Sequence, residues 1–129
     1  MENHDLGGGF LNWGCIPSKA LLAVVEPGDK VKKASDYGLT VEGSVGYDPV
    51  RMVARKNKVV EGLVKGIATL FKSWNIEHIE GTGELLDAKS LRVAQRDGTE
   101  TTVQADAIVI ATGSSWPNLP LFPVDGRQI

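Results

Sequence analysis

The sequence predicts an α/β domain that contains one long amphipathic helix and an antiparallel β-meander. Three observations predict this class. Apolar residues recur every three or four positions from 49 to 73, and the period changes to two from 76 to 105. An uninterrupted apolar run then follows at 107–111. With 129 residues, the chain is long enough for one domain or part of one.

The first helical signal comes early in the chain. Pro17 suits the first position of a helix, because its missing N–H would have no partner there. We expect a short helix at 18–25, followed by a turn at 26–29. A further helical turn at 30–37 and a loop at 38–46 complete this stretch.

The long helix has a clear start signal and a consistent apolar face. Asp48 offers an N-cap acceptor and Pro49 fits the first helical position. The apolar positions that follow are Val53, Val60, Val64, Ile67 and Phe71. Residues 49–73 therefore form a helix of roughly 37 Å, which we expect to cross a whole sheet or bundle.

The second half of the chain alternates as strands do. The expected strands are 76–86, 90–95 and 101–105, joined by turns at 87–89 and at Asp97-Gly98. The run at 107–111 lacks polar alternation, which predicts a strand buried on both faces. Residues 116–129 carry three prolines and indicate an extended exit segment.

Composition excludes several function classes. Fourteen basic and sixteen acidic side chains give a net charge of −2, which predicts no attraction to nucleic acid or to a membrane surface. The longest apolar runs are far below the roughly 20 residues of a bilayer span. One cysteine excludes an internal disulfide and favours a reducing compartment, so we expect a cytoplasmic protein. We expect no metal site.

Residues 7–22, which read GGGFLNWGCIPSKALL, carry the strongest chemical signal. Three successive glycines let the backbone approach a phosphate or a flat ring, although a flexible turn explains them equally well. A thiolate at Cys15 would be stabilised by the positive end of the following helix and by Lys19. The alternative for Cys15 is a small buried apolar residue.

This segment closely resembles the redox-site segment of the class I pyridine nucleotide-disulfide oxidoreductases, most closely that of the dihydrolipoamide dehydrogenases. Further landmarks of the family follow in order and cover practically the whole chain. They are the long helix, Gly81-Thr82-Gly83, Ala111-Thr112-Gly113-Ser114 and Leu119-Pro120-x-x-Pro123-x-Asp125-Gly126. The resemblance implies a Rossmann-like, three-layer FAD-binding domain.

The resemblance also implies that residues 1–129 are an incomplete FAD-binding domain. The G-x-G-x-x-G unit, the NAD-binding domain and the dimerisation domain of the family have no counterpart in this sequence. We therefore expect FAD as the cofactor, with NAD used by the intact family, and weak FAD binding by this chain alone. The intact family forms homodimers, and its members join 2-oxoacid dehydrogenase complexes.

Residue by residue, the resemblance implies two catalytic groups, Cys15 and Lys19. Cys15 would be the flavin-proximal cysteine, in charge-transfer contact with the isoalloxazine, and Lys19 would point toward the flavin N5. Glu2 would bind the FAD ribose. The other expected cofactor-binding residues are Gly7, Gly8, Gly9, Gly14, Gly83, Thr112, Gly113 and Ser114.

The departure from the family pattern is Phe10, which stands where relatives have the interchange cysteine. Phenylalanine has no sulfur, so the mixed-disulfide step of the family has no nucleophile. The family's acid/base histidine belongs to the C-terminal domain of the partner subunit, and neither His4 nor His78 replaces it. We therefore expect a chain that does not perform the family's reaction.

Two alternative functions remain open at this stage. The third glycine and Trp13 suggest a soluble transhydrogenase or a mercuric reductase-like relative, although the transhydrogenase branch keeps the first cysteine and loses the second. A non-catalytic remnant or interaction module is the other alternative. We expect Trp13 and Trp74 to be packing residues. The basic residues Arg51, Arg55, Lys56, Lys58 and Lys65 are expected to form a solvated helix face.

Overall fold

The computed structural model describes residues 5–114 and 120–121, so the expected role of Glu2 and most of the exit segment lie outside the described residues. The helices are α1 (Gly8–Asn12), α2 (Cys15–Lys32), the short 3-10 helix η1 (Ala34–Tyr37) and α3 (Pro49–Ser73). The strands are β1 (Thr82–Leu85), β2 (Ser90–Ala94) and β3 (Glu100–Gln104). Helices and sheet together confirm the α/β class.

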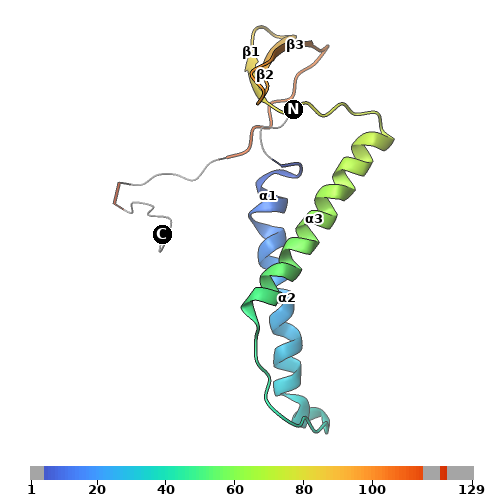
Figure 1. The fold of residues 1–129 in the computed structure, drawn as a ribbon, viewed down its shortest axis with the longest axis vertical. Coiled ribbons are helices and arrows are strands. Elements are labelled where there is room, and N and C mark those ends of the chain that lie inside the picture. The colour runs from blue at the N-terminus through green and yellow to red at the C-terminus, as the bar shows by residue number, and fades with distance from the viewer. Residues whose placement is uncertain (1–4, 115–119, 122–129) are drawn as a thin grey trace.

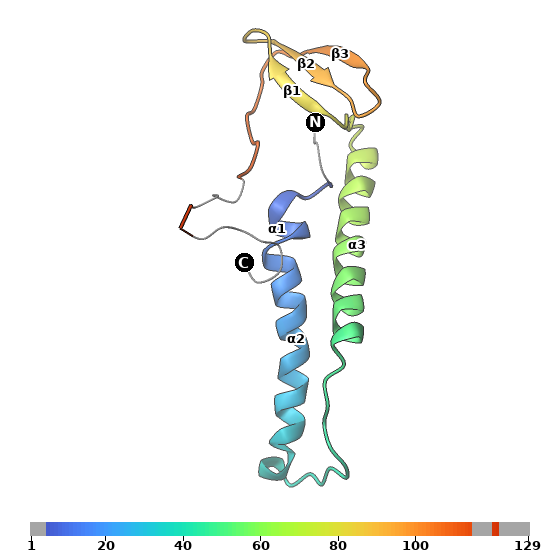
Figure 2. The ribbon, with the colours of Figure 1, turned by 60° about the vertical axis from the view of Figure 1, so that its left-hand side comes forward.

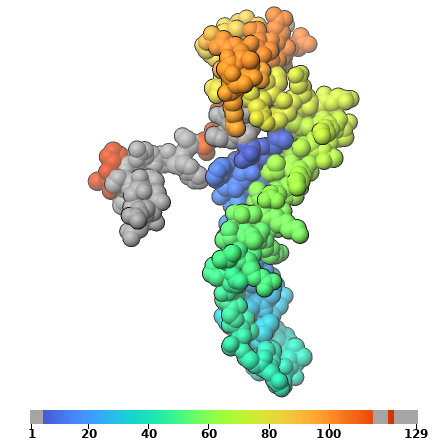
Figure 3. Space-filling view, viewed as in Figure 1, coloured from blue at the N-terminus to red at the C-terminus, as the bar shows by residue number. Residues whose placement is uncertain are grey.

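The elements form an elongated body. Figure 1 shows α2 and α3 side by side, with the small sheet beyond the C-terminal end of α3. The same arrangement is seen after rotation (Figure 2), where α1 lies at the sheet end of α2. In the space-filling view, the first described residues lie between the sheet and the pair formed by α2 and α3 (Figure 3).

Helix α3 has the bounds that the sequence predicts, but it packs differently from the expectation. The Asp48 carboxylate accepts a hydrogen bond from the backbone N–H of Arg51 at 3.1 Å, with Pro49 at the first position. Instead of crossing a sheet, α3 packs along α2. Arg55, expected on a solvated face, donates from Nη1 to the Ala20 carbonyl at 3.1 Å and so ties α3 to α2.

Helix α2 is longer than predicted at both ends. It begins at Cys15, so Pro17 is its third residue and not its first, and the expected turn at 26–29 is wrong. Pro27 and Gly28 lie inside the helix. Gly28 is buried, and an added Cβ there would overlap the Tyr47 hydroxyl. The Lys32 ammonium lies 5.4 Å from the centroid of the Tyr47 ring. Packing of the 38–47 connection against α2 thus outweighs the turn preference of the local sequence.

The β-meander is confirmed, with shorter strands than predicted. The order is β1-β2-β3, and both pairs are antiparallel. Val93 in β2 pairs with Gly83 and Thr101 and is fully buried. The Asp97-Gly98 turn is present, with Gly98 at φ +86°.

The run at 107–111 is neither a strand nor buried, which contradicts the sequence expectation. Val109 is 88% exposed and Ile110 is 69% exposed. A strand buried on both faces needs neighbouring strands and covering layers, and the described sheet contains only the three strands of the meander. Ile108 and Ile110 instead line a hollow of about 410 Å³ beside Leu85 and Leu86.

The buried apolar core within the described residues is small. Its members are Leu11, Ala20, Ala34 and Val93. Trp13 and Trp74, expected to be packing residues, are both mostly exposed. At the sheet end of α3, the His78 ring packs edge-on against Phe71, with 6.1 Å between ring centroids. Few buried side chains therefore stabilise the packing of the helices, and few stabilise the sheet.

We predict that Asp48→Ala destabilises the chain by about 1 kcal/mol, the usual cost of losing an N-cap acceptor. Urea unfolding followed by circular dichroism measures this change. Asp106→Ala is the matched control, because Asp106 makes no side-chain hydrogen bond or ion pair within the described residues. Equal destabilisation by the two variants would contradict the capping role.

We predict that the β2–β3 turn opens as pH falls. Hydrogen bonds from the Thr99 hydroxyl and the Thr99 backbone N–H lower the pKa of Asp97. A lowered folded-state pKa gives stability that is complete above the unfolded-state pKa of about 3.9 and is lost as pH falls through the folded value. The NMR shift of the Thr99 amide, followed on acidification, reports this step.

Asp97→Asn is the control for this titration, because its amide oxygen still accepts hydrogen bonds but does not ionise. The Thr99 signal should then be insensitive to pH in the acid range. A titration of the same size in the variant would show that another group controls the turn.

Candidate functional site

The connection between α1 and α2 is closed by the Gly9 carbonyl. This oxygen accepts hydrogen bonds from the N–H groups of Trp13 at 3.0 Å and Gly14 at 2.8 Å. A Cβ at Gly14 would lie 3.3 Å from that oxygen and 3.8 Å from the Phe10 Cα. The turn therefore brings Phe10 against Gly14, next to Cys15.

Cys15 is the first residue of α2, and its free thiol is exposed. The Ser18 hydroxyl donates to the Gly14 carbonyl at 3.1 Å and to the Cys15 carbonyl at 3.0 Å, which ties the first turn together. Lys19 is exposed and follows Cys15 by four residues, so both lie on one face of the helix. The result is an accessible thiol at the positive end of an 18-residue helix.

The three successive glycines differ in their surroundings. Gly7 has φ +98° and is packed, since an added Cβ would lie 2.8 Å from Leu11 Cδ1 and 3.2 Å from Ile67 Cδ1. Gly8 has φ +59°, and added Cβ atoms at Gly8 and Gly9 would meet nothing within 4 Å. Only Gly8 and Gly9 thus present an open backbone, whereas Gly7 fits against α1 and α3.

Asn12 is a residue that sequence reasoning missed. Its Nδ2 donates to the Leu6 carbonyl at 3.1 Å and to the Gly8 carbonyl at 3.0 Å, across the glycine segment. The available signal was an amide side chain four residues after a glycine. Asn12 therefore belongs to the structure of the site.

The structure brings one group of the expected residues together and leaves another apart. Gly7, Gly8, Gly9, Gly14, Cys15 and Lys19 all lie at the α1–α2 connection. Gly83 lies in β1, opposite Val93. Thr112, Gly113 and Ser114 are exposed after β3, and within the described residues no backbone hydrogen bond joins them to the glycines. Within the first group, only Gly8 and Gly9 leave open space beside the backbone.

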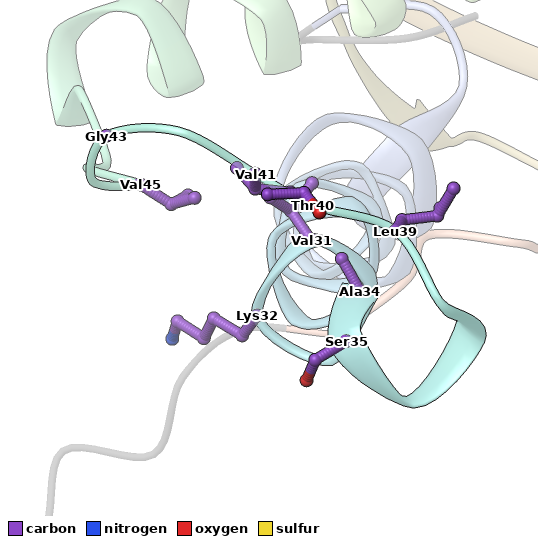
Figure 4. A pocket seen from close by; sticks show the side chains of 9 residues that line it. All are labelled: Val31, Lys32, Ala34, Ser35, Leu39, Thr40, Val41, Gly43 and Val45. Carbon is purple, nitrogen blue, oxygen red and sulfur yellow. The ribbon is translucent and has the colours of Figure 1, made fainter.

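A second hollow lies at the opposite end of α2 from Cys15. Its volume is about 500 Å³, and it lies between the end of α2, η1 and the following loop (Figure 4). Val31, Val41 and Val45 supply apolar walls, and Lys32 and Ser35 supply polar groups. The length of α2 separates it from the thiol by about 25 Å, so it takes no part in thiol chemistry.

Neither a metal-binding cluster nor a membrane-spanning helix is found within the described residues. Among residues 5–114 and 120–121, no group of three or more His, Cys, Asp or Glu side chains is placed to hold a metal ion. Within that same part of the chain, no helix combines the length and the apolar character needed to cross a bilayer.

Comparison with known proteins identifies relatives over the full length of the chain. A dihydrolipoyl dehydrogenase of Bacillus subtilis (strain 168) is 38% identical over 130 residues, which is all of this chain and 28% of the relative. A dihydrolipoyl dehydrogenase of Zymomonas mobilis is 36% identical, with 100% and 28% covered. A leghemoglobin reductase of Vigna unguiculata is 38% identical, with 99% and 24% covered.

The chain therefore spans about a quarter of the length of these relatives. The sequence profile described as pyridine nucleotide-disulphide oxidoreductase matches residues 2–128. The three successive glycines, the Cys15 thiol and α3 all lie within this match. The chain belongs to the pyridine nucleotide-disulphide oxidoreductase family.

Proposed function

We propose that this chain is the flavin-facing segment of a dihydrolipoyl dehydrogenase-like disulfide oxidoreductase. The observation that carries the proposal is the exposed Cys15 thiol at the start of α2, beside the open backbone of Gly8 and Gly9. Similarity to dihydrolipoyl dehydrogenases along the whole chain supports it. Residues 1–129 would form part of an FAD-binding domain.

Each residue at the α1–α2 connection has a proposed role. Gly8 and Gly9 allow close approach of the flavin, because no side-chain atom stands over them. Gly14 fixes the start of α2, and Cys15 provides the flavin-side thiol. Lys19 places a cation on the same helix face. Bound FAD would supply a two-electron acceptor.

The remaining contacts with FAD are proposed from the family resemblance. They come from Glu2, Gly83, Thr112, Gly113 and Ser114. NAD, a second copy of the subunit and a 2-oxoacid dehydrogenase complex are proposed for a protein that also contains the family's other domains. The free, exposed thiol favours a reducing compartment such as the cytoplasm.

Phe10 removes one half of the proposed redox pair. In the family, dihydrolipoamide transfers two electrons through a cysteine pair to NAD, giving lipoamide and NADH. In that reaction a dihydrolipoamide thiolate attacks the substrate-side sulfur of the enzyme disulfide and displaces the other cysteine as a thiolate, and Phe10 offers no sulfur at that position. We therefore propose that this chain does not catalyse the dihydrolipoamide reaction.

We predict that titration of the chain with FAD produces a long-wavelength absorbance band from contact between the Cys15 thiolate and the flavin. Cys15→Ser should abolish the band while leaving the FAD affinity nearly unchanged, because the serine hydroxyl stays protonated. Lys19→Met should weaken both band and affinity. Lys72→Met, an exposed lysine in the last turn of α3, is the matched control and should change neither.

A band that persists in Cys15→Ser would contradict the assigned role of the thiol. A chain that retains no FAD after gel filtration but unfolds cooperatively as a monomer would instead support a non-catalytic interaction module.

A further inference from the structure

Asn12 connects the peptide group before Gly7 to the peptide group after Gly8. Its half-buried side chain donates from Nδ2 to the Leu6 carbonyl at 3.1 Å and to the Gly8 carbonyl at 3.0 Å. A carboxamide nitrogen carries two hydrogens. Both are therefore used on the glycine segment.

These two hydrogen bonds fix the direction of two peptide planes. The described chain contains no cis peptide bond, and in a trans peptide the C=O and the N–H point to opposite sides. When the Leu6 and Gly8 carbonyls face Asn12, the N–H groups of Gly7 and Gly9 face away from it. One side chain thus sets how this backbone is presented.

The end of the segment is also held by the helix, because Gly8 and Gly9 begin α1 and the Gly9 carbonyl accepts the N–H groups of Trp13 and Gly14. The contacts at its beginning leave more of this role to Asn12. The hydrogen bond from the Gly8 N–H to the Asp5 carbonyl is long, at 3.4 Å. Leu11 and Ile67 limit Gly7 by packing alone. Successive glycines lose more conformational entropy on ordering than other residues do, so they need such a tie.

We infer that Asn12 is a positioning residue, which holds the Gly7–Gly9 backbone in the conformation that receives the ligand of the site. The identity of that ligand as FAD rests on the proposed function. The chemistry of the position is specific. Aspartate would turn a carboxylate toward two carbonyl oxygens, and leucine offers no donor, whereas glutamine keeps both donors on a longer stem.

Backbone NMR relaxation of the 129-residue chain tests the inference without FAD. In the parent chain, order parameters of Gly7–Gly9 should approach the value of about 0.85 typical of rigid backbone, and in Asn12→Asp and Asn12→Leu they should fall below about 0.6. Asn12→Gln should restore part of the order. Asn57→Asp makes the same chemical change at an exposed position of α3 and should have no effect.

Unchanged order in Asn12→Asp and Asn12→Leu would overturn the inference, as would an equal loss of order along α2 and α3. FAD affinity, measured on the same variants, should fall about tenfold or more, as expected for the loss of two modest hydrogen bonds. The order parameters of Gly7–Gly9 could fall in these variants although the parent chain binds no FAD. That result would support the positioning role of Asn12 and refute the flavin proposal.

Discussion

The hydrogen bond from the Gly14 N–H to the Gly9 carbonyl, at 2.8 Å, is the interaction on which the site depends. It closes the turn between α1 and α2 and places Phe10 against Gly14. Gly14 then caps α2, so that Cys15 becomes the first helical residue. A free thiol at this position lies beside the helix N-terminus, where an anion is stabilised.

The helical pair supports this turn from the other side. Arg55 ties α3 to the Ala20 carbonyl, which holds the two helices together. With α3 in place, Ile67 closes over Gly7 and, together with Leu11, leaves no room for a Cβ. Asn12 then fixes the peptide before Gly7 and the peptide after Gly8. Packing and hydrogen bonding thus act on different faces of the same short segment.

Local sequence signals predicted the elements whose stabilising contacts are local. The bounds of α3 follow from Asp48, Pro49 and a regular apolar face, and the Asp97-Gly98 turn follows from residues that favour it. Helix α2 was predicted too short, because the contact of Tyr47 with Gly28 joins residues distant in sequence. The run at 107–111 was misassigned for the converse reason, since its apolar character says nothing of available strand partners.

The site was predictable in part for the same reason. Cys15, Lys19 and the glycines are contiguous in sequence, and one turn collects them. Arg55 acts on a carbonyl 35 residues away, and the role of Asn12 depends on the path of the backbone. The periodicity of the sequence predicts neither the Arg55 contact nor the Asn12 contact. The place of Gly83 depends on the pairing of β1 with β2. Residues 112–114 depend on how the chain after β3 is placed, which their own sequence does not determine.

We propose that Phe10 stands where the second thiol of a redox pair with Cys15 would lie. Phe10→Cys tests it most directly, by mild oxidation followed by thiol alkylation and mass spectrometry. We expect the introduced thiol to pair with Cys15, so that neither is alkylated. Val50→Cys, at an exposed position of α3, should leave both thiols free. Two alkylated thiols in oxidised Phe10→Cys would contradict the account.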